Sequence, residues 1–256
     1  MTAFLADIRS TFVADPKGRH GPLPPVLLSM TVVTGLVDSF SYLALGHVFV
    51  ANVTGNIVFL GFALAGAPGF SIGASLTAVV SFAVGALVGG RLGARHSDHR
   101  GRLHSSAAAI QAVFLAVAVI LAAVSGSPVT TAFRYPLIAV LAVSMGIQNA
   151  AARKLAVPDL TTTVLTLTIT GIAADSTLAG GAGSRAGRRL TAVAAMLVGA
   201  LVGATLVLHT SIYYPLLIAL MAILAGAVAT HQLGKPDSAW IKAAPAATGS
   251  PTPPRS

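Results

Sequence analysis

Residues 76–92 read LTAVVSFAVGALVGGRL, and residues 190–206 read LTAVAAMLVGALVGATL. The two runs align without a gap and share 11 of their 17 residues, an identity that a common bias toward Ala, Val, Leu and Gly does not explain. A weaker match continues upstream, where it pairs Gly35 and Asp38 with Gly146 and Asn149 and, after a small gap, Thr54 with Thr163. The sequence therefore predicts two related halves, each built on a unit of about 110 residues.

The composition predicts that both halves lie in a membrane. Only 9% of the residues are charged and 55% are apolar, with a mean hydropathy of +0.82. A soluble domain carries charge on about a quarter of its residues, so this chain cannot make a water-soluble surface. Each membrane crossing needs about 20 apolar residues, which leaves room for several helices and for no large soluble domain. We expect an all-α, polytopic transmembrane helical bundle.

Eight apolar segments divide the chain: 24–45, 48–66, 71–92, 105–124, 135–152, 160–179, 190–209 and 213–231. The expected transmembrane domain is 24–233, with repeat 1 at about 24–124 and repeat 2 at about 135–231. Residues 1–23 carry charges and no long apolar run, so we expect a cytoplasmic tail or a short interfacial helix, and no signal peptide. Residues 234–256 are rich in Pro, Ala, Ser and Thr, which predicts a disordered tail.

The positive charges decide how many segments cross. They gather in the N-terminal tail, at residues 91–102, at Arg153 and Lys154, at residues 185–189 and in the C-terminal tail. If all eight segments cross, the cluster at 91–102 lies opposite the N-terminus, against the preference of basic loops for the cytoplasm. If segments 48–66 and 160–179 instead enter and return on one side, every cluster and both termini are cytoplasmic and the halves are inverted. We therefore expect six full crossings and two broken or re-entrant segments; eight crossings with parallel halves is the alternative.

Both broken segments carry polar residues. In the first, these are Asn52, Thr54 and Asn56 around a glycine that lets the backbone leave helical geometry. In the second, the threonines that share one helical face are Thr163, Thr166 and Thr170. Such groups can line a solute or ion pathway. They can equally bond to their own helix or to a neighbour as ordinary membrane contacts, which is the alternative.

Asp38 is the sharpest single candidate for a functional residue. It lies inside the first apolar segment, where a carboxylate is costly unless it is paired or protonated. The repeat places Gln148 and Asn149 in the corresponding part of the second half. We expect these residues to contribute to a solute or ion site at the junction of the halves; a neutral Asp38 that only holds the structure together is the alternative.

A pair of glycines with three residues between them recurs in each copy of the repeat. The pairs are Gly85 with Gly89 and Gly199 with Gly203. Small residues at this spacing let membrane helices approach closely. We expect these faces to pack on each other or on a second copy of the chain in a homo-oligomer.

Several classes of activity are not expected. The chain has no cysteine, which excludes disulfides, thiolate metal sites and cysteine nucleophiles. No HExxH, GxSxG or Walker A sequence is present, so we predict no enzyme, no metal and no cofactor. A net charge of +9 would suit nucleic acid in a soluble protein. Here the charges flank membrane segments, so the expected partner is the lipid bilayer and not nucleic acid.

The polar motifs also point to a family. They are GLVD at 35–38, VFVANVTGN at 48–56, GIQNA at 146–150 and the threonine run at 162–166. With them, roughly residues 25–230 resemble the YoaK family of bacterial integral membrane proteins of unknown function. The resemblance implies a multi-pass protein of the bacterial cytoplasmic (inner) membrane and supplies no substrate. We expect a small secondary transporter or solute-permeation protein; a non-transporting interaction or structural protein that oligomerises through its GxxxG faces is the alternative.

Overall fold

The computed structural model describes residues 2–15, 18–160, 162–163, 165–181, 185–234, 238 and 240–242. The regular elements of these residues are helical. They are α1 (Thr2–Phe12), α2 (Leu23–Ala44), α3 (Thr54–Leu64), α4 (Ile72–Arg95), α5 (Arg100–Ser125), α6 (Thr131–Leu155), α7 (Leu165–Ala174), the single 3-10 turn η1 (Thr177–Ala179), α8 (Ala186–His209) and α9 (Tyr214–Leu233).

Six of these helices are long and apolar enough to cross a membrane, namely α2, α4, α5, α6, α8 and α9. Each has 20 to 26 residues, and at 1.5 Å per residue such a helix spans the hydrocarbon core of about 30 Å. By contrast, α3 has 11 residues and α7 has 10, so neither can cross. The prediction of six crossings with two broken segments is confirmed, and the alternative of eight crossings is wrong.

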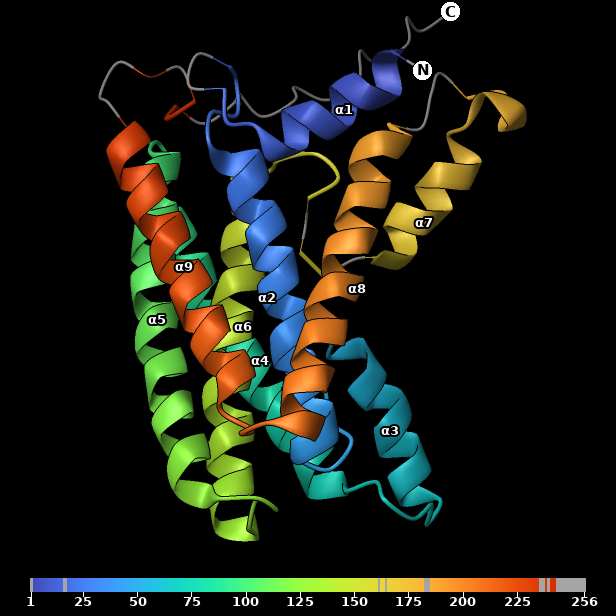
Figure 1. Cartoon of the computed structure of the whole chain (residues 1–256), viewed down its shortest axis with the longest axis vertical. Coiled ribbons are helices and arrows are strands. Elements are labelled where there is room, and N and C mark those ends of the chain that lie inside the picture. The colour runs from blue at the N-terminus through green and yellow to red at the C-terminus, as the bar shows by residue number, and fades with distance from the viewer. Residues whose placement is uncertain are drawn as a thin grey trace, which may run out of the picture.

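The two short helices lie in opposite halves of the bundle. Figure 1 shows α2 running from the upper end, which carries α1, to the lower end of the bundle. The chain then turns back into the bundle, and α3 runs to the lower end again. After α6, which ascends, the chain again turns inward and α7 returns to the upper end. We call residues 45–65 the first re-entrant segment and residues 156–174 the second. The two halves are therefore inverted, as the charge pattern predicted.

Two close helix pairs join the halves. The helix α4 packs along α6, and α8 packs along α2, so the third helix of each half meets the first helix of the other. A Cβ atom at Gly85 would lie 2.1 Å from the Val143 carbonyl oxygen, and one at Gly199 would lie 2.1 Å from that of Val32. Only glycine permits this approach of backbones.

The GxxxG faces are thus filled within one chain. All four glycines, Gly85, Gly89, Gly199 and Gly203, are buried against the first helix of the opposite half. The close helix packing expected of these glycines is present, but the partners are α6 and α2 of the same chain, whereas the glycine faces were expected to pack on each other or on a second copy. The pairing is symmetric: Gly146 of α6 faces Gly85, and Gly35 of α2 faces Gly199.

The basic clusters lie at one end of the bundle, which we call the basic end. It is formed by the start of α2, the α4–α5 connection, the end of α6 and the start of α8 (Figure 1). The helix α1 lies across this end and packs on α8 and α2. The N-terminal tail therefore contains a helix, which packs against the bundle.

The prediction of a disordered tail from residue 234 is wrong for part of it. Trp240 is fully buried, and its ring lies against Gly21 and Gly101. The Ile241 carbonyl oxygen accepts a hydrogen bond from the Arg100 amide at 2.9 Å. The composition of this tail is mostly polar, but its one tryptophan packs in a space that the two glycines leave open. Residues 243–256 lie outside the described residues.

Candidate functional site

The first re-entrant segment is attached to α2 through the carboxylate of Asp38. Asp38 Oδ1 accepts hydrogen bonds from the amides of Val50 (3.0 Å) and Ala51 (2.8 Å). Its Oδ2 accepts from the amide of Asn52 (3.0 Å) and from the Asn52 side chain (2.6 Å). The three backbone donors belong to non-helical chain that would otherwise lack partners inside the bundle. Asp38 is 5% exposed, and four donors occupy both of its oxygens. Its geometry is that of a group that holds the segment.

Asn56, in the first turn of α3, holds the same segment from its other side. Its Oδ1 accepts from the Phe49 amide at 2.9 Å, and its Nδ2 donates to the Phe49 carbonyl at 2.5 Å. The amide side chain thus pairs with one residue as a neighbouring β-strand would. Asn56 is fully buried, whereas Thr54, the first residue of α3, is exposed.

An aromatic cluster packs around the first segment. It comprises Tyr42, His47, Phe49, Phe59, Phe62 and Phe70, whose ring centroids lie 5.0 to 6.3 Å apart in contacting pairs. A hydrogen bond of 3.0 Å also joins His47 Nδ1 to the Gly69 carbonyl oxygen. Aromatic pairs at such distances add favourable packing beyond the area they bury. The first segment is therefore held by buried hydrogen bonds and by ring contacts together.

The second re-entrant segment uses the equivalent position on α6. Asn149 donates to the Met145 carbonyl of its own helix at 3.0 Å, and its Oδ1 accepts from the Thr163 hydroxyl at 2.5 Å. The separation of Asn149 from Thr163 is 14 residues, the same as that of Asp38 from Asn52. Thr163 therefore corresponds to Asn52 in space. The sequence alignment had paired it with Thr54, two residues away.

Ion pairs, and not rings, hold the rest of the second segment. Arg189 of α8 donates to Asp159 at 2.9 Å and to Asp175 at 2.7 Å, so one guanidinium joins the residues before and after α7. Arg185 lies 3.7 Å from Asp159. A Cβ atom at Gly171 would lie 2.4 Å from an Arg189 nitrogen, so the guanidinium rests directly on α7.

Much of α7 is exposed in the described structure. Leu167 is 70% and Ile169 is 56% exposed, and Thr166 and Thr170 are exposed as well. The expected stripe of Thr163, Thr166 and Thr170 therefore divides: the first hydroxyl bonds to α6, and the other two lie on the outer surface of α7. The stripe does not face a closed interior.

Gln148 belongs to a different cluster from its neighbour Asn149. The Gln111 side chain donates to Gln148 Oε1 at 2.6 Å, and Gln148 Nε2 donates to the Thr34 hydroxyl at 3.0 Å and to the Met30 carbonyl at 3.3 Å. These contacts join α5, α6 and α2 in the core. Successive residues of a helix point about 100° apart, so Gln148 and Asn149 face different neighbours. The sequence did not identify Gln111 and Thr34 as the partners of Gln148.

A groove opens beside the second re-entrant segment on the α4–α6 pair. Its volume is about 860 Å³, and the residues that line it are Phe82, Ala86, Gly90, Asn149, Ala150, Arg153 and Lys154. Asn149, which accepts the Thr163 hydrogen bond, is the uncharged polar residue of this lining. The two cations of the lining, Arg153 and Lys154, lie toward the basic end. No carboxylate is among these lining residues. We call it the α4–α6 groove.

The inverted halves and the paired short helices define a polytopic helical membrane protein with two re-entrant segments. A family model described as "Protein of unknown function (DUF1275)" matches residues 26–230, and the chain belongs to this family. It is 37% identical over 152 residues to the UPF0700 transmembrane protein YoaK of Bacillus subtilis (strain 168). That match covers 58% of this chain and 65% of the relative, which is less than two thirds of its length. No solved structure matches the chain.

Proposed function

We propose that the protein is a small secondary transporter or solute-permeation protein. The observation that carries the proposal is the pair of re-entrant segments, which enter inverted halves from opposite ends and stop inside the bundle. Non-helical backbone at membrane depth is tolerated where protein buries it or where it lines a water-filled cavity. Inverted repeats with broken helices are the usual construction of secondary transporters, with the solute site near the middle.

The unequal attachment of the two segments supports a division of roles. The first segment is the fixed one, because Asp38, Asn52 and Asn56 hold it through buried hydrogen bonds. The second is held to α6 by the Thr163 to Asn149 bond and to α8 by ion pairs. Segments with few buried contacts open most readily. We infer that the second segment moves and that the α4–α6 groove is the pathway on its side.

The proposal assigns the site residues accordingly. Asn149 and Thr163 contact the solute when their mutual bond opens, and Thr166 and Thr170 line the path once α7 turns. The residues that position the first segment are Asp38, Asn52 and Asn56, and Gln148 joins the core helices. Thr54 is exposed at the start of α3 and has no assigned role. The basic end faces the cytoplasm of a bacterial inner membrane, because basic loops are retained on that side.

A reversible lock tests the proposal. The chain has no cysteine, so Asn149→Cys with Thr163→Cys introduces the only thiols, at two side chains that touch in the structure. The protein is reconstituted in liposomes and assayed for uptake of labelled inorganic anions, carboxylates, amino acids, sugars and alkali cations. We expect uptake of at least one class, lost on oxidation and restored by reduction. Asn149→Cys alone is the control and should not respond to the oxidant.

The same assay separates the proposal from a non-transporting structural protein. A structural protein gives no uptake from any class in either redox state, although oxidation raises its melting temperature. That outcome contradicts the proposal. Uptake that continues unchanged in the oxidised double variant also contradicts the assignment of motion to the second segment.

A further inference from the structure

We propose that a cavity at the basic end, between the ends of α4 and α6 and the start of α5, binds a phosphate group. The cavity has a volume of about 160 Å³, larger than one water molecule needs. It is lined by Gly93, His96, Ser97, Arg100, Leu103, Lys154, Leu155 and Ala156. This inference does not depend on the proposed function.

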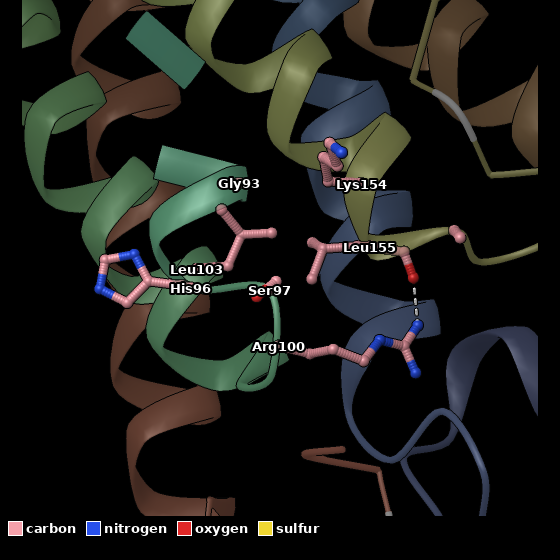
Figure 2. A pocket seen from close by; sticks show the side chains of 8 residues that line it. Gly93, His96, Ser97, Arg100, Leu103, Lys154 and Leu155 are labelled. Atoms are coloured by element: carbon pink, nitrogen blue, oxygen red, sulfur yellow. Dashed lines mark hydrogen bonds between the residues drawn. The ribbon is translucent and has the colours of Figure 1, made fainter. Parts of the chain in front are cut away.

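Two cations from different helices border the cavity. Figure 2 shows Arg100 of α5 and Lys154 of α6 on opposite sides of Leu155. The stem of Lys154 folds over Gly93, where a Cβ atom would lie 2.7 Å from the lysine Cγ. A glycine at position 93 therefore leaves the space in which the lysine lies and the cavity forms.

Neither cation has an acidic partner within the described residues. The Arg100 guanidinium donates to the Leu155 carbonyl, to the Arg19 carbonyl at 3.3 Å, and bonds His20 Nδ1 at 3.3 Å. Arg100 is only 5% exposed. A buried cation is costly unless an anion or several acceptors compensate it. The two carbonyl oxygens accept hydrogen bonds from some of the N–H groups of Arg100, but they carry no negative charge to balance the guanidinium.

The neighbouring histidine, His20, is kept uncharged mainly by burial and further by the cations around it. Burial, and then the nearby cations Arg100, Arg188 and Arg19, lower the pKa of His20 to about 4. At neutral pH the imidazole is uncharged and can accept from Arg100. The positive-inside preference explains exposed basic residues at this end. It does not account for a buried arginine beside a cavity that an exposed lysine also borders.

Phosphate is the chemistry that suits this arrangement. Arg and Lys bind phosphate oxygens through short charge-assisted hydrogen bonds, and basic pockets between helices at the cytoplasmic side hold lipid headgroups. The cavity lies at the helix ends, which is headgroup depth for crossing helices of this length. The phosphate can belong to an anionic lipid or to a free phosphate compound.

Binding is tested by the thermal shift of the full-length protein in detergent. One arm compares phosphatidylglycerol with phosphatidylcholine, and a second compares inorganic phosphate with chloride at equal ionic strength. A lipid site responds to phosphatidylglycerol alone, and a site for free phosphate responds in both arms. No shift with either phosphate probe overturns the proposal.

Matched variants assign the binding to the cavity. Lys154→Gln should weaken the apparent affinity about tenfold, the loss of one charge-assisted bond. Gly93→Leu, which keeps both charges and fills the space, should weaken it at least as much. Arg95→Gln removes an exposed cation of the same end outside the lining and should change affinity less than about twofold. Equal losses in Lys154→Gln and Arg95→Gln would show diffuse surface attraction and overturn the proposal.

Discussion

The two re-entrant segments occupy equivalent places in inverted halves and are held by different chemistry. The first is attached from within, by the buried carboxylate of Asp38 and by a cluster of rings. The second is attached by one hydroxyl bond to Asn149 and by ion pairs to Arg189, one of whose partners is 54% exposed. Both helix pairs that carry the segments keep the same glycine contacts. The two halves therefore share one scaffold and differ in how their short segments are attached, which gives one firmly held segment and one weakly held segment.

The largest expected effect comes from removing the group that holds each segment. Asp38→Ala leaves the amides of residues 50, 51 and 52 without their acceptor, at a cost of about 3 to 6 kcal/mol in the free energy of unfolding. Asn149→Ala removes a single side-chain bond between segment and helix and should cost about 1 kcal/mol. The apparent melting temperature in detergent, with the fraction recovered as monodisperse protein, measures both.

Asp38→Asn serves as the intermediate control. It keeps one acceptor oxygen but turns a donor toward the backbone amides, so its melting temperature should fall between those of the wild type and Asp38→Ala. A loss in Asn149→Ala as large as that in Asp38→Ala would contradict the difference between the segments.

A smaller effect is expected from the ion pairs of the second segment. Arg189→Gln removes the partner of Asp175, whose side chain is 54% exposed, while Arg185 remains 3.7 Å from the less exposed Asp159. Pairs with an exposed partner contribute about 1 kcal/mol or less to stability. We expect faster amide hydrogen exchange in Leu165–Ala174 and little change in Thr54–Leu64, with a small fall in melting temperature. The neighbouring change Arg188→Gln, whose side chain contacts Ser10 of α1, is the control. Equal loss of protection in both short helices would argue against independent attachment.

The smallest effect is a pH dependence confined to the basic end. Because the pKa of His20 is lowered to about 4, the folded protein binds this proton only near pH 4, whereas the unfolded chain binds it near 6.5. A lowered histidine pKa reduces stability as pH falls from about 6.5 to about 4, with no further change outside that window. The measurement is the difference in melting temperature between wild type and His20→Gln across this range. A difference that is constant with pH would exclude the assignment.

Much of the architecture follows from the sequence because the membrane restricts the choices. Apolar length gives the crossings, and the asymmetry of basic residues identifies the two segments that do not cross. The repeat 76–92 and 190–206 predicts that the same helix recurs, and the structure adds that it packs on the first helix of the other half. The identity of that partner helix could not be predicted, because the GxxxG spacing indicates a close helix contact but does not specify which helix makes it.

The candidate site was predictable only in part. Asp38 and the Asn52 to Asn56 run stood out as polar residues in apolar surroundings, but the bond from Asp38 to the amides of residues 50–52 depends on the chain turning back. Arg189 carried no signal beyond its basic cluster, because its two aspartates are 30 and 14 residues away. Trp240 was hidden in a polar tail, and its site depends on Gly21 and Gly101 from distant elements.

The two re-entrant segments enter from opposite ends of the bundle, and this inverted arrangement can be measured. Single cysteines in the cysteine-free chain test it directly, with a membrane-impermeant thiol reagent applied to intact and to opened vesicles of known orientation. Ala65→Cys, after α3, should react on one side, and Leu178→Cys, after α7, should react on the other together with the reference Ser97→Cys in the basic α4–α5 connection. Labelling of Ala65→Cys and Leu178→Cys on the same side of the membrane would contradict the inverted arrangement.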